Sequence, residues 1–297
     1  MALKVYTKEF AKVLEDVYEA QQHFMEPFGG ALQVVDGIKS SDTFMSLKVS
    51  DVEVTIQDYD TGEDVGFGSG TGNSTRFGER KEIKSIDKDI EFEKPLAIHE
   101  GVDSVTVNDD ADEVIKERAA AHAEAWVEHI NGFLSEALSK NAGKTLKATE
   151  LSKEGVIAAF DEASKEFTNN KVSKKVARYA YVSPDVYNLL VNNGLTTSAK
   201  NSSVNIDDNA LTRFKGFVIK EIADEYFQTS ENIYFVAQNV GVAGVGIEIY
   251  RMLDSEDFAG VAIQSAAKYG KYVPEKNKKA ILKAKLKAPV ASKSPDA

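Results

Sequence analysis

The sequence predicts an α+β protein whose helices and strands are segregated along the chain instead of strictly alternating. Three observations predict this class: a helical pattern of about thirty residues, alternating apolar residues on both sides of a glycine-rich segment, and short alternating runs in the C-terminal half. Segregated elements of both kinds are typical of this class. A chain of 297 residues has room for one large domain or two ordinary ones.

The N-terminal region, residues 1–26, has apolar residues at helical spacing, and Pro27, Gly29 and Gly30 follow it. Two interpretations are open: a movable terminal arm or an ordinary first core helix. Residues 44–98 alternate as β-strands around a segment at 59–79 that contains six glycines. We therefore expect a long two-stranded hairpin with a flexible tip, which needs cover from its own chain or from another one.

The strongest element is a helix expected over 109–141, which would be a rod about 45 Å long. Further elements are expected after it, each from its apolar pattern and its start signal. They are a helix after Ser152, a strand at 178–182, a helix starting at Pro184, strands near 217–219 and 233–236, two long strands around 245–249 and 261–263, and a closing strand at 280–287 with one lysine face.

Composition excludes several kinds of chemistry. The chain has no cysteine, so disulfides, thiol nucleophiles and thiolate metal sites are absent, and it has only four histidines. No apolar run is long enough to span a membrane, and the first residues lack the apolar core of a secretion signal, so we expect neither a membrane anchor nor secretion.

The charge is unevenly distributed. Of the net charge of −11, residues 271–297 carry +6 and the remainder −17. So acidic a body disfavours general DNA binding. The basic tail is interpreted as a solubilising strand or terminus that could dock on an acidic neighbour, and contact with nucleic acid is the alternative.

The motifs that resemble catalytic or binding sites favour plainer interpretations. Asp60-Thr61-Gly62 matches the aspartic-protease tripeptide, but it occurs once, among acidic and glycine-rich neighbours, so a turn is expected. The glycine-rich tip at 66–72 lacks the spacing of a phosphate-binding loop. His122 and His129 are seven residues apart, whereas paired metal ligands on a helix prefer a spacing of four.

Carboxylates and sequons complete the motif search. Asp87, Asp89, Glu91 and Glu93 could bind calcium, but no EF-hand pattern surrounds them and a solvated face is expected. The sequons at Asn73 and Asn201 mean little without secretion. We therefore predict no catalytic, cofactor-binding or metal-binding residue, no cofactor and no enzymatic activity.

The order of elements resembles the HK97-fold major capsid proteins of tailed double-stranded DNA bacteriophages. The resemblance rests on the hairpin, the long helix, the strand-Pro-helix segment at 178–190 (RYAYVSPDVYNLL) and the paired strands at 241–272. It implies the following division: an N-terminal arm at 1–38, an E-loop hairpin at 39–98, a P-domain with its spine helix at 99–176, an axial A-domain at 177–243, returning P-domain strands at 244–273, and an A-domain closing strand with a basic tail at 274–297.

The resemblance also implies a function and partners. Identical subunits would form pentamers and hexamers of an icosahedral shell around packaged DNA, without sequence-specific DNA contact. A separate scaffolding protein is expected, since the chain has no room for a scaffolding extension, and a portal protein would occupy one vertex. The protein would be part of the virion and assemble in the bacterial cytoplasm. Some relatives cross-link a hairpin lysine, and Lys81, Lys84 and Lys88 are on the hairpin here, but no partner residue is matched.

Two alternative functions remain open at this stage. One is an encapsulin-like subunit of a protein compartment, which would enclose enzymes instead of DNA. The other belongs to a different class, an enzyme that uses carboxylates, and it requires a deep pocket with converging Asp or Glu side chains.

Overall fold

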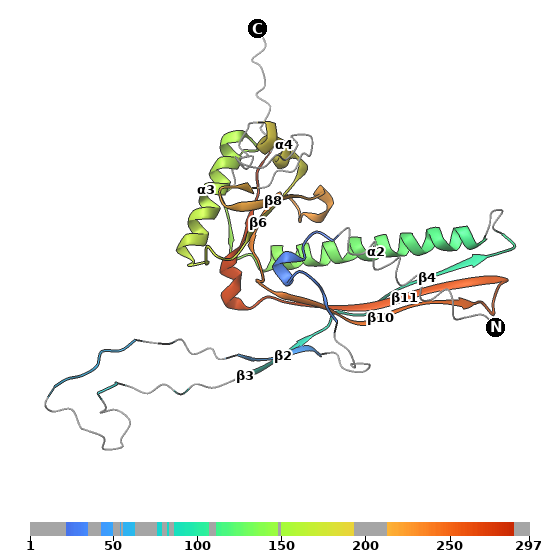
Figure 1. Cartoon of the computed structure of the whole chain (residues 1–297), viewed down its shortest axis with the longest axis horizontal. Coiled ribbons are helices and arrows are strands. Elements are labelled where there is room, and N and C mark those ends of the chain that lie inside the picture. Colours follow the sequence, from blue (N-terminus) through green and yellow to red (C-terminus); the bar gives the residue numbers. More distant parts are fainter. Residues whose placement is uncertain are drawn as a thin grey trace, which may run out of the picture. The chain divides into compact units, whose positions relative to one another are not determined.

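The computed structural model describes residues 22–34, 43–49, 54, 56–62, 76–78, 82, 86–106, 111–147, 150–192 and 213–287. The chain divides into two compact units: the body (Met1–Lys39 and Phe92–Ala297) and the hairpin unit (Ser40–Glu91). In chain order, the elements are η1 Glu26–Phe28, β1 Gln33–Val34, β2 Thr43–Val49, β3 Ile86–Glu91, β4 Leu96–Asp103, α2 Ala111–Lys140, β5 Lys144–Thr145, α3 Lys153–Asn169, β6 Arg178–Val182, α4 Pro184–Asn192, β7 Arg213–Phe214, β8 Phe217–Glu221, η2 Asp224–Tyr226, β9 Ile233–Ala237, β10 Val242–Asp254, β11 Gly260–Tyr272, η3 Glu275–Ala280 and β12 Ile281–Ala284 (Figure 1).

One part of the body is a long sheet with a helix along it. Its strand order is β1-β10-β11-β4, and α2 runs beside β4 and β11 (Figure 1). The indole N–H of Trp126 on α2 donates to the Ser265 hydroxyl on β11 at 3.0 Å. About two turns closer to the start of the helix, Arg118 Nε donates to Glu100 on β4 at 2.7 Å. The helix expected over 109–141 is confirmed, and apolar contacts and polar links hold it on the sheet.

The second part is a six-stranded sheet of order β5-β12-β9-β6-β8-β7. The parallel pairing of β6 with β8 means that both strands begin at one end of the sheet and finish at the other. On one face, Phe160 of α3 packs edge-on against Phe214, Phe217 and Phe235 with ring centroids 4.9–5.9 Å apart. Alternation then sends Tyr181 and Tyr234 to the opposite face. The expected helix after Ser152 is α3, and the Ser152 hydroxyl caps it by accepting from Gly155 N at 3.2 Å.

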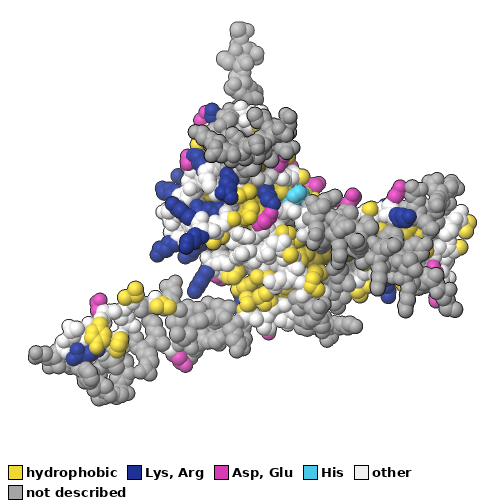
Figure 2. All heavy atoms as spheres, in the orientation of Figure 1, with side chains coloured by type: hydrophobic (Ala, Val, Ile, Leu, Met, Phe, Trp, Pro, Cys, Tyr) yellow, Lys and Arg dark blue, Asp and Glu magenta, His cyan; other side chains and the backbone are white. Residues whose placement is uncertain are grey.

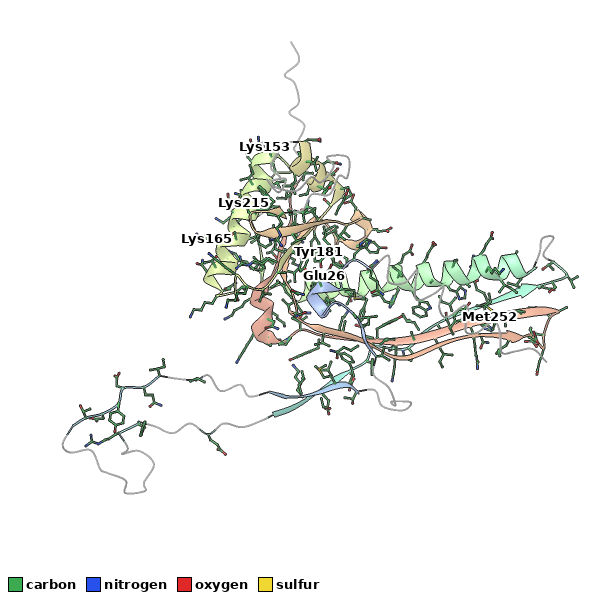
Figure 3. The ribbon with its side chains drawn as sticks, in the orientation of Figure 1. Glu26, Lys153, Lys165, Tyr181, Lys215 and Met252 are labelled. Carbon is green, nitrogen blue, oxygen red and sulfur yellow. The ribbon has the colours of Figure 1, made fainter. Side chains whose placement is uncertain are left out.

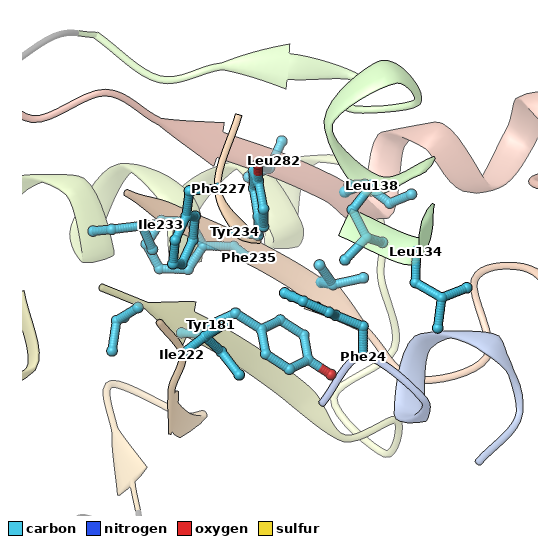
Figure 4. Packing of buried hydrophobic residues seen from close by; sticks show 14 of the residues in the cluster. Phe24, Leu134, Leu138, Tyr181, Ile222, Phe227, Ile233, Tyr234, Phe235 and Leu282 are labelled. Atoms are coloured by element: carbon cyan, nitrogen blue, oxygen red, sulfur yellow. The ribbon is translucent and has the colours of Figure 1, made fainter. Parts of the chain in front are cut away.

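A short N-terminal segment joins the two parts of the body. The buried ring of Phe24 lies 4.8 Å from the ring of Tyr181, beside Leu134 and Leu138 from α2 (Figure 4). Glu26 accepts a hydrogen bond of 2.9 Å from the Tyr181 hydroxyl and forms an ion pair with Lys220 on β8. This segment therefore fills the space between α2 and the six-stranded sheet, and the core is continuous through it.

The helix expected over residues 1–26 lies largely outside the described residues. The described end of that region is the turn η1, and Gly29 follows it with φ of +99°, a left-handed conformation that favours glycine. The predicted end of that helix at Pro27 and the glycine pair is not tested, because the residues before 22 are not described.

The hairpin unit contains an antiparallel pair, β2 with β3, in a register that joins Thr43 to Glu91 and Val49 to Ile86. The sequence interpretation continued the returning arm to residue 98, and this is wrong for its last part. Residues 96–103 form β4, which pairs with β11 instead, from Leu96 opposite Ala267 to Gly260 opposite Asp103. The apolar phase of Leu96 and Ile98 reflects a new strand of the body and not the hairpin, because a period of two alone does not tell which strand is the partner.

Two of the C-terminal lysines form ion pairs with acidic residues of the body. The closing strand expected over 280–287 is the shorter β12, Ile281–Ala284. Lys283 on it forms a 2.8 Å ion pair with Glu231, whose side chain is 3% exposed. Lys271 lies over the Phe133 ring at 3.8 Å and pairs with Glu136 at 2.9 Å. These two lysines are therefore parts of the packed structure and do not simply solubilise a terminal segment. Residues 288–297 lie outside the described part of the chain.

None of the helices in the described part of the chain is long and apolar enough to cross a membrane.

We predict that Phe160→Ala lowers the free energy of unfolding by about 3–5 kcal/mol, because it opens a cavity among three aromatic rings. Chemical denaturation measures the loss. The partly exposed Val191 of α4 is the control, since Val191→Ala should change stability by about 0.5 kcal/mol or less. If Phe160→Ala lowered the free energy of unfolding by less than about 1 kcal/mol, the packing described would be contradicted.

We predict acid sensitivity from Glu136. Hydrogen bonds from Lys140 and Lys271 lower the pKa of Glu136 from 4.5 to about 2. A carboxyl whose pKa is lower in the folded protein stabilises it above pH 4.5 and loses that effect as the pH falls toward 2. Glu136→Gln should therefore flatten the fall in thermal midpoint between pH 4.5 and 2. An unchanged slope in the variant would exclude Glu136 as its source.

Candidate assembly surfaces

The hairpin unit exposes apolar side chains along both of its arms. Val54 and Ile56 are each 96% exposed and Phe77 is 77% exposed. Beyond the paired strands, the arms meet again where the Tyr59 and Phe77 rings make an edge-to-face contact at 5.1 Å. Asp60 N also donates to the Arg76 carbonyl at 2.9 Å. A two-stranded ribbon is marginally stable alone in water, so exposed apolar residues along it are typical of a contact surface.

A basic pocket lies at the end of the six-stranded sheet where β6 and β8 begin. It has a volume of about 490 Å³, and its cationic lining residues are Lys174, Lys175, Arg178, Arg213 and Lys215. Figure 2 shows lysine and arginine side chains gathered on this side of the body, and Figure 3 labels Lys215 there with Lys165 of α3 nearby. In a chain with a net charge of −11, this local excess of positive charge is the opposite of the average surface.

The turn between β7 and β8 shapes the edge of this pocket. Phe214 pairs with Phe217, so Lys215 and Gly216 form a two-residue turn, with φ of +46° and +88°. Two positive φ values in succession are typical of the type I′ turn, which matches the twist of a hairpin. Glycine adopts this conformation readily, whereas a lysine there is strained.

Arg178 is the most unusual group in the pocket. Its side chain is buried, with the residue 9% exposed, and lies 5.2 Å from the Phe167 ring centroid. One terminal nitrogen donates to the Val172 carbonyl at 2.9 Å, but Nε has no hydrogen-bond partner among the described residues. Burial lowers the pKa of this guanidinium. A buried cation with an unsatisfied donor is costly unless an anion reaches it.

The sequence interpretation missed the basic pocket, because it weighed catalytic motifs and the C-terminal lysines only. The available signal was local: residues 171–178 and 213–216 contain six cations and no carboxylate. Only the parallel pairing of β6 with β8 brings these two segments together.

Asp60-Thr61-Gly62 forms a local turn, as expected. Gly62 N donates to Asp60 Oδ1 at 2.9 Å, which is the hydrogen bond of an Asx turn. The glycine-rich tip at 66–72, the sequons and the lysines Lys81 and Lys84 lie outside the described residues. Lys88 lies on β3 opposite Leu47.

The two helical histidines have separate surroundings. His122 is 2% exposed and its Nε2 lies 3.2 Å from Glu100 Oε2. The Arg118 hydrogen bond is the main cause that lowers the pKa of Glu100. His129 packs against the Phe133 and Tyr269 rings, and burial lowers its pKa. In the described part of the chain, no group of three or more His, Asp or Glu residues is arranged to hold a metal ion.

The acidic residues near the end of β3 are divided between the units. Asp89, in the hairpin unit, accepts a 2.5 Å hydrogen bond from Ser46, while Glu93, in the body, pairs with Lys271 at 3.2 Å. The side chain of Asp87 lies outside the described residues. Asp89 and Glu93 each have a different local partner.

No known family profile matches this chain, and no curated protein matches it in sequence. Solved structures do match it. The chain from Mycobacterium phage Che8 superposes with a TM-score of 0.62 at 19% identity, covering 84% of this chain and 86% of that one. The chain from the mature capsid of bacteriophage PhiM1 gives 0.61 at 13% identity, with 89% and 87% covered.

The fold is the HK97-like capsid fold. The chain of a virus-like particle from Pyrococcus furiosus is also similar, with a TM-score of 0.53 at 15% identity over 94% of this chain and 99% of that one. The predicted α+β class and HK97-like fold are therefore confirmed. The α+β class was predicted from the helix and strand patterns, and the HK97-like fold from the resemblance in the order of elements.

Proposed function

We propose that this chain is the major capsid protein of a tailed double-stranded DNA bacteriophage, which assembles into pentamers and hexamers of an icosahedral shell. The observation that carries the proposal is the HK97-like fold over most of the chain, shared with a chain of the PhiM1 mature capsid. In this proposal the protein is a structural part of the virion with no enzymatic role, and it assembles in the host cytoplasm.

The division of the chain follows from the same fold. We propose an N-terminal arm at 1–38, a P-domain at 99–176 and 244–273, and an A-domain at 177–243 and 274–297. The long sheet with α2 fits the P-domain, and the six-stranded sheet fits the A-domain. The proposed E-loop at 39–98 is shortened to the hairpin unit, since β4 pairs with β11.

The hairpin unit gives a physical reason for self-assembly. Val54, Ile56 and Phe77 expose apolar surface that costs free energy in water. Covering this surface with a second copy recovers that cost, and many such contacts in a closed shell add up through multivalency.

The proposed partners are identical subunits, a separate scaffolding protein, a portal protein at one vertex and packaged DNA without sequence-specific contact. The net charge of −11 supports the last point, because a shell of like charge does not adhere to the DNA that it encloses.

A compartment shell of the encapsulin type is the second candidate, and the similarity to the Pyrococcus furiosus virus-like particle favours it. The contents of the particle separate the two functions. Double-stranded DNA inside shells purified from infected cells supports the phage capsid, whereas protein cargo supports the compartment.

Negative-stain electron microscopy of the purified full chain, alone and after co-expression with the neighbouring genes, tests the proposal. Closed shells, capsomer rings or sheets are expected. A compact monomer that persists at high concentration under both conditions would contradict it. Efficient closure of shells by the chain alone would count against a separate scaffolding protein.

We predict that Val54→Ser with Ile56→Ser reduces assembly at least about tenfold, because the change removes apolar area from the proposed contact. Sedimentation velocity measures the assembled fraction. Val54→Leu with Ile56→Leu is the matched control, since it keeps the apolar area and should assemble normally. Both variants should keep the thermal midpoint of the wild-type subunit, as the two side chains are almost fully exposed. Normal assembly of the serine variant would exclude this part of the hairpin unit from the contact.

A further inference from the structure

The six-stranded sheet has opposite charges at its two ends. Residues 171–178 and 213–216, at the end where β6 and β8 begin, contain six cations and no carboxylate. Residues 183–192 and 221–232, which follow the other ends of the same strands, contain five carboxylates and neither lysine nor arginine. Because the strands are parallel, the basic end and the acidic end lie one strand length apart, about 15 Å.

The acidic end presents exposed carboxylates. Asp185, Glu221, Asp224 and Glu225 are exposed, whereas Glu231 is buried and pairs with Lys283 at 2.8 Å and with Lys285 at 3.8 Å. The nearest cation in the sequence, Lys220, already forms an ion pair with Glu26. The acidic end is therefore four exposed negative charges at the start of α4 and around η2.

The basic end has room for an anion. One carboxylate, Asp161 of α3, pairs with Lys215. No ion pair to Lys174, Lys175, Arg178 or Arg213 occurs within the described residues. The pocket of about 490 Å³ has five cationic lining residues, four of which have no described ion pair, and this indicates that an anionic group enters from outside.

We propose that the basic pocket of one copy receives the acidic end, Asp185, Glu221, Asp224 and Glu225, of a second copy. The two ends of one chain face away from each other along the strands and cannot meet, so the contact joins different copies head to tail. A head-to-tail contact generates a ring when the rotation between copies closes. This inference rests on the proposed function and assigns the surface that would set the direction of the subunits around a capsomer.

A second copy fits the pocket better than nucleic acid does. The partner's four carboxylates form a small cluster, and the cations of the pocket form a small cluster as well. A DNA duplex instead carries phosphates along its whole length, and the acidic body repels them. Binding of DNA at the basic end is the alternative that the experiment must separate.

Charge reversal in the full chain tests the contact. The basic-end variant is Lys174→Glu with Lys175→Glu, and the acidic-end variant is Asp224→Lys with Glu225→Lys. All four residues are exposed, so the fold should be kept, and circular dichroism checks this. The matched control is Lys147→Glu with Lys153→Glu, which reverses two exposed lysines that do not line the pocket. Lys153 is the first residue of α3, at the opposite end of that helix from the pocket residues Ser164 and Thr168 (Figure 3).

Each reversed variant should assemble at least about tenfold less than the wild type at low salt, measured by sedimentation velocity, and the control should assemble normally. The variant with all four changes should regain assembly, because its charges are exchanged and again complementary. The two reversed variants should also co-assemble when they are mixed.

Three results would overturn the inference. Normal assembly of both reversed variants would remove this contact while leaving the capsid function intact. Normal assembly of the basic-end variant combined with a loss of affinity for duplex DNA would assign the pocket to phosphate instead. A wild-type chain that never assembles would overturn the proposed function and the contact together.

Discussion

The body depends on the segment around Phe24 and Glu26, which joins two parts that would otherwise have separate cores. Phe24 fills the space between the end of α2 and the face of the six-stranded sheet that presents Tyr181. The carboxylate of Glu26 accepts from the Tyr181 hydroxyl, and burial together with the nearby Glu26 charge raises the pKa of Tyr181. The buried Tyr181 hydroxyl needs a hydrogen-bond partner, so its bond to Glu26 fixes which residue of the N-terminal segment lies against the sheet.

The sequence predicted the elements better than their partners. The periodicity of α2, the Ser152 cap and the alternation in β6, β8 and β9 each depend on neighbours within a few residues, so the chain itself reports them. The pairing of β4 with β11 connects residues more than 150 positions apart, and Leu96 and Ile98 have the same alternation whichever strand they join. Partner choice is set by packing in three dimensions, which local pattern does not record.

Charge shows the same limit at the candidate surfaces. A count of lysines near the C-terminus correctly located positive charge, but it could not tell that Lys283 pairs with the buried Glu231 or that Lys271 covers the Phe133 ring. Conversely, no single segment of the sequence predicted the basic pocket. Arg178 and Arg213 line the same pocket because β6 and β8 pair in parallel. The turn at Asp60 could be predicted from the sequence because its hydrogen bond joins residues only two positions apart.

The division into two units has a consequence for the exchange of backbone hydrogens. The body has a continuous core through the Phe24 segment, so its amides should be protected as one cooperative block. Strands β2 and β3 pair only with each other in the described sheet, so the free energy needed to open this ribbon locally is small. In a subunit kept apart from its neighbours, β2 and β3 should therefore take up deuterium early, and the change in their uptake on joining a particle would report directly how firmly a neighbouring copy holds the ribbon.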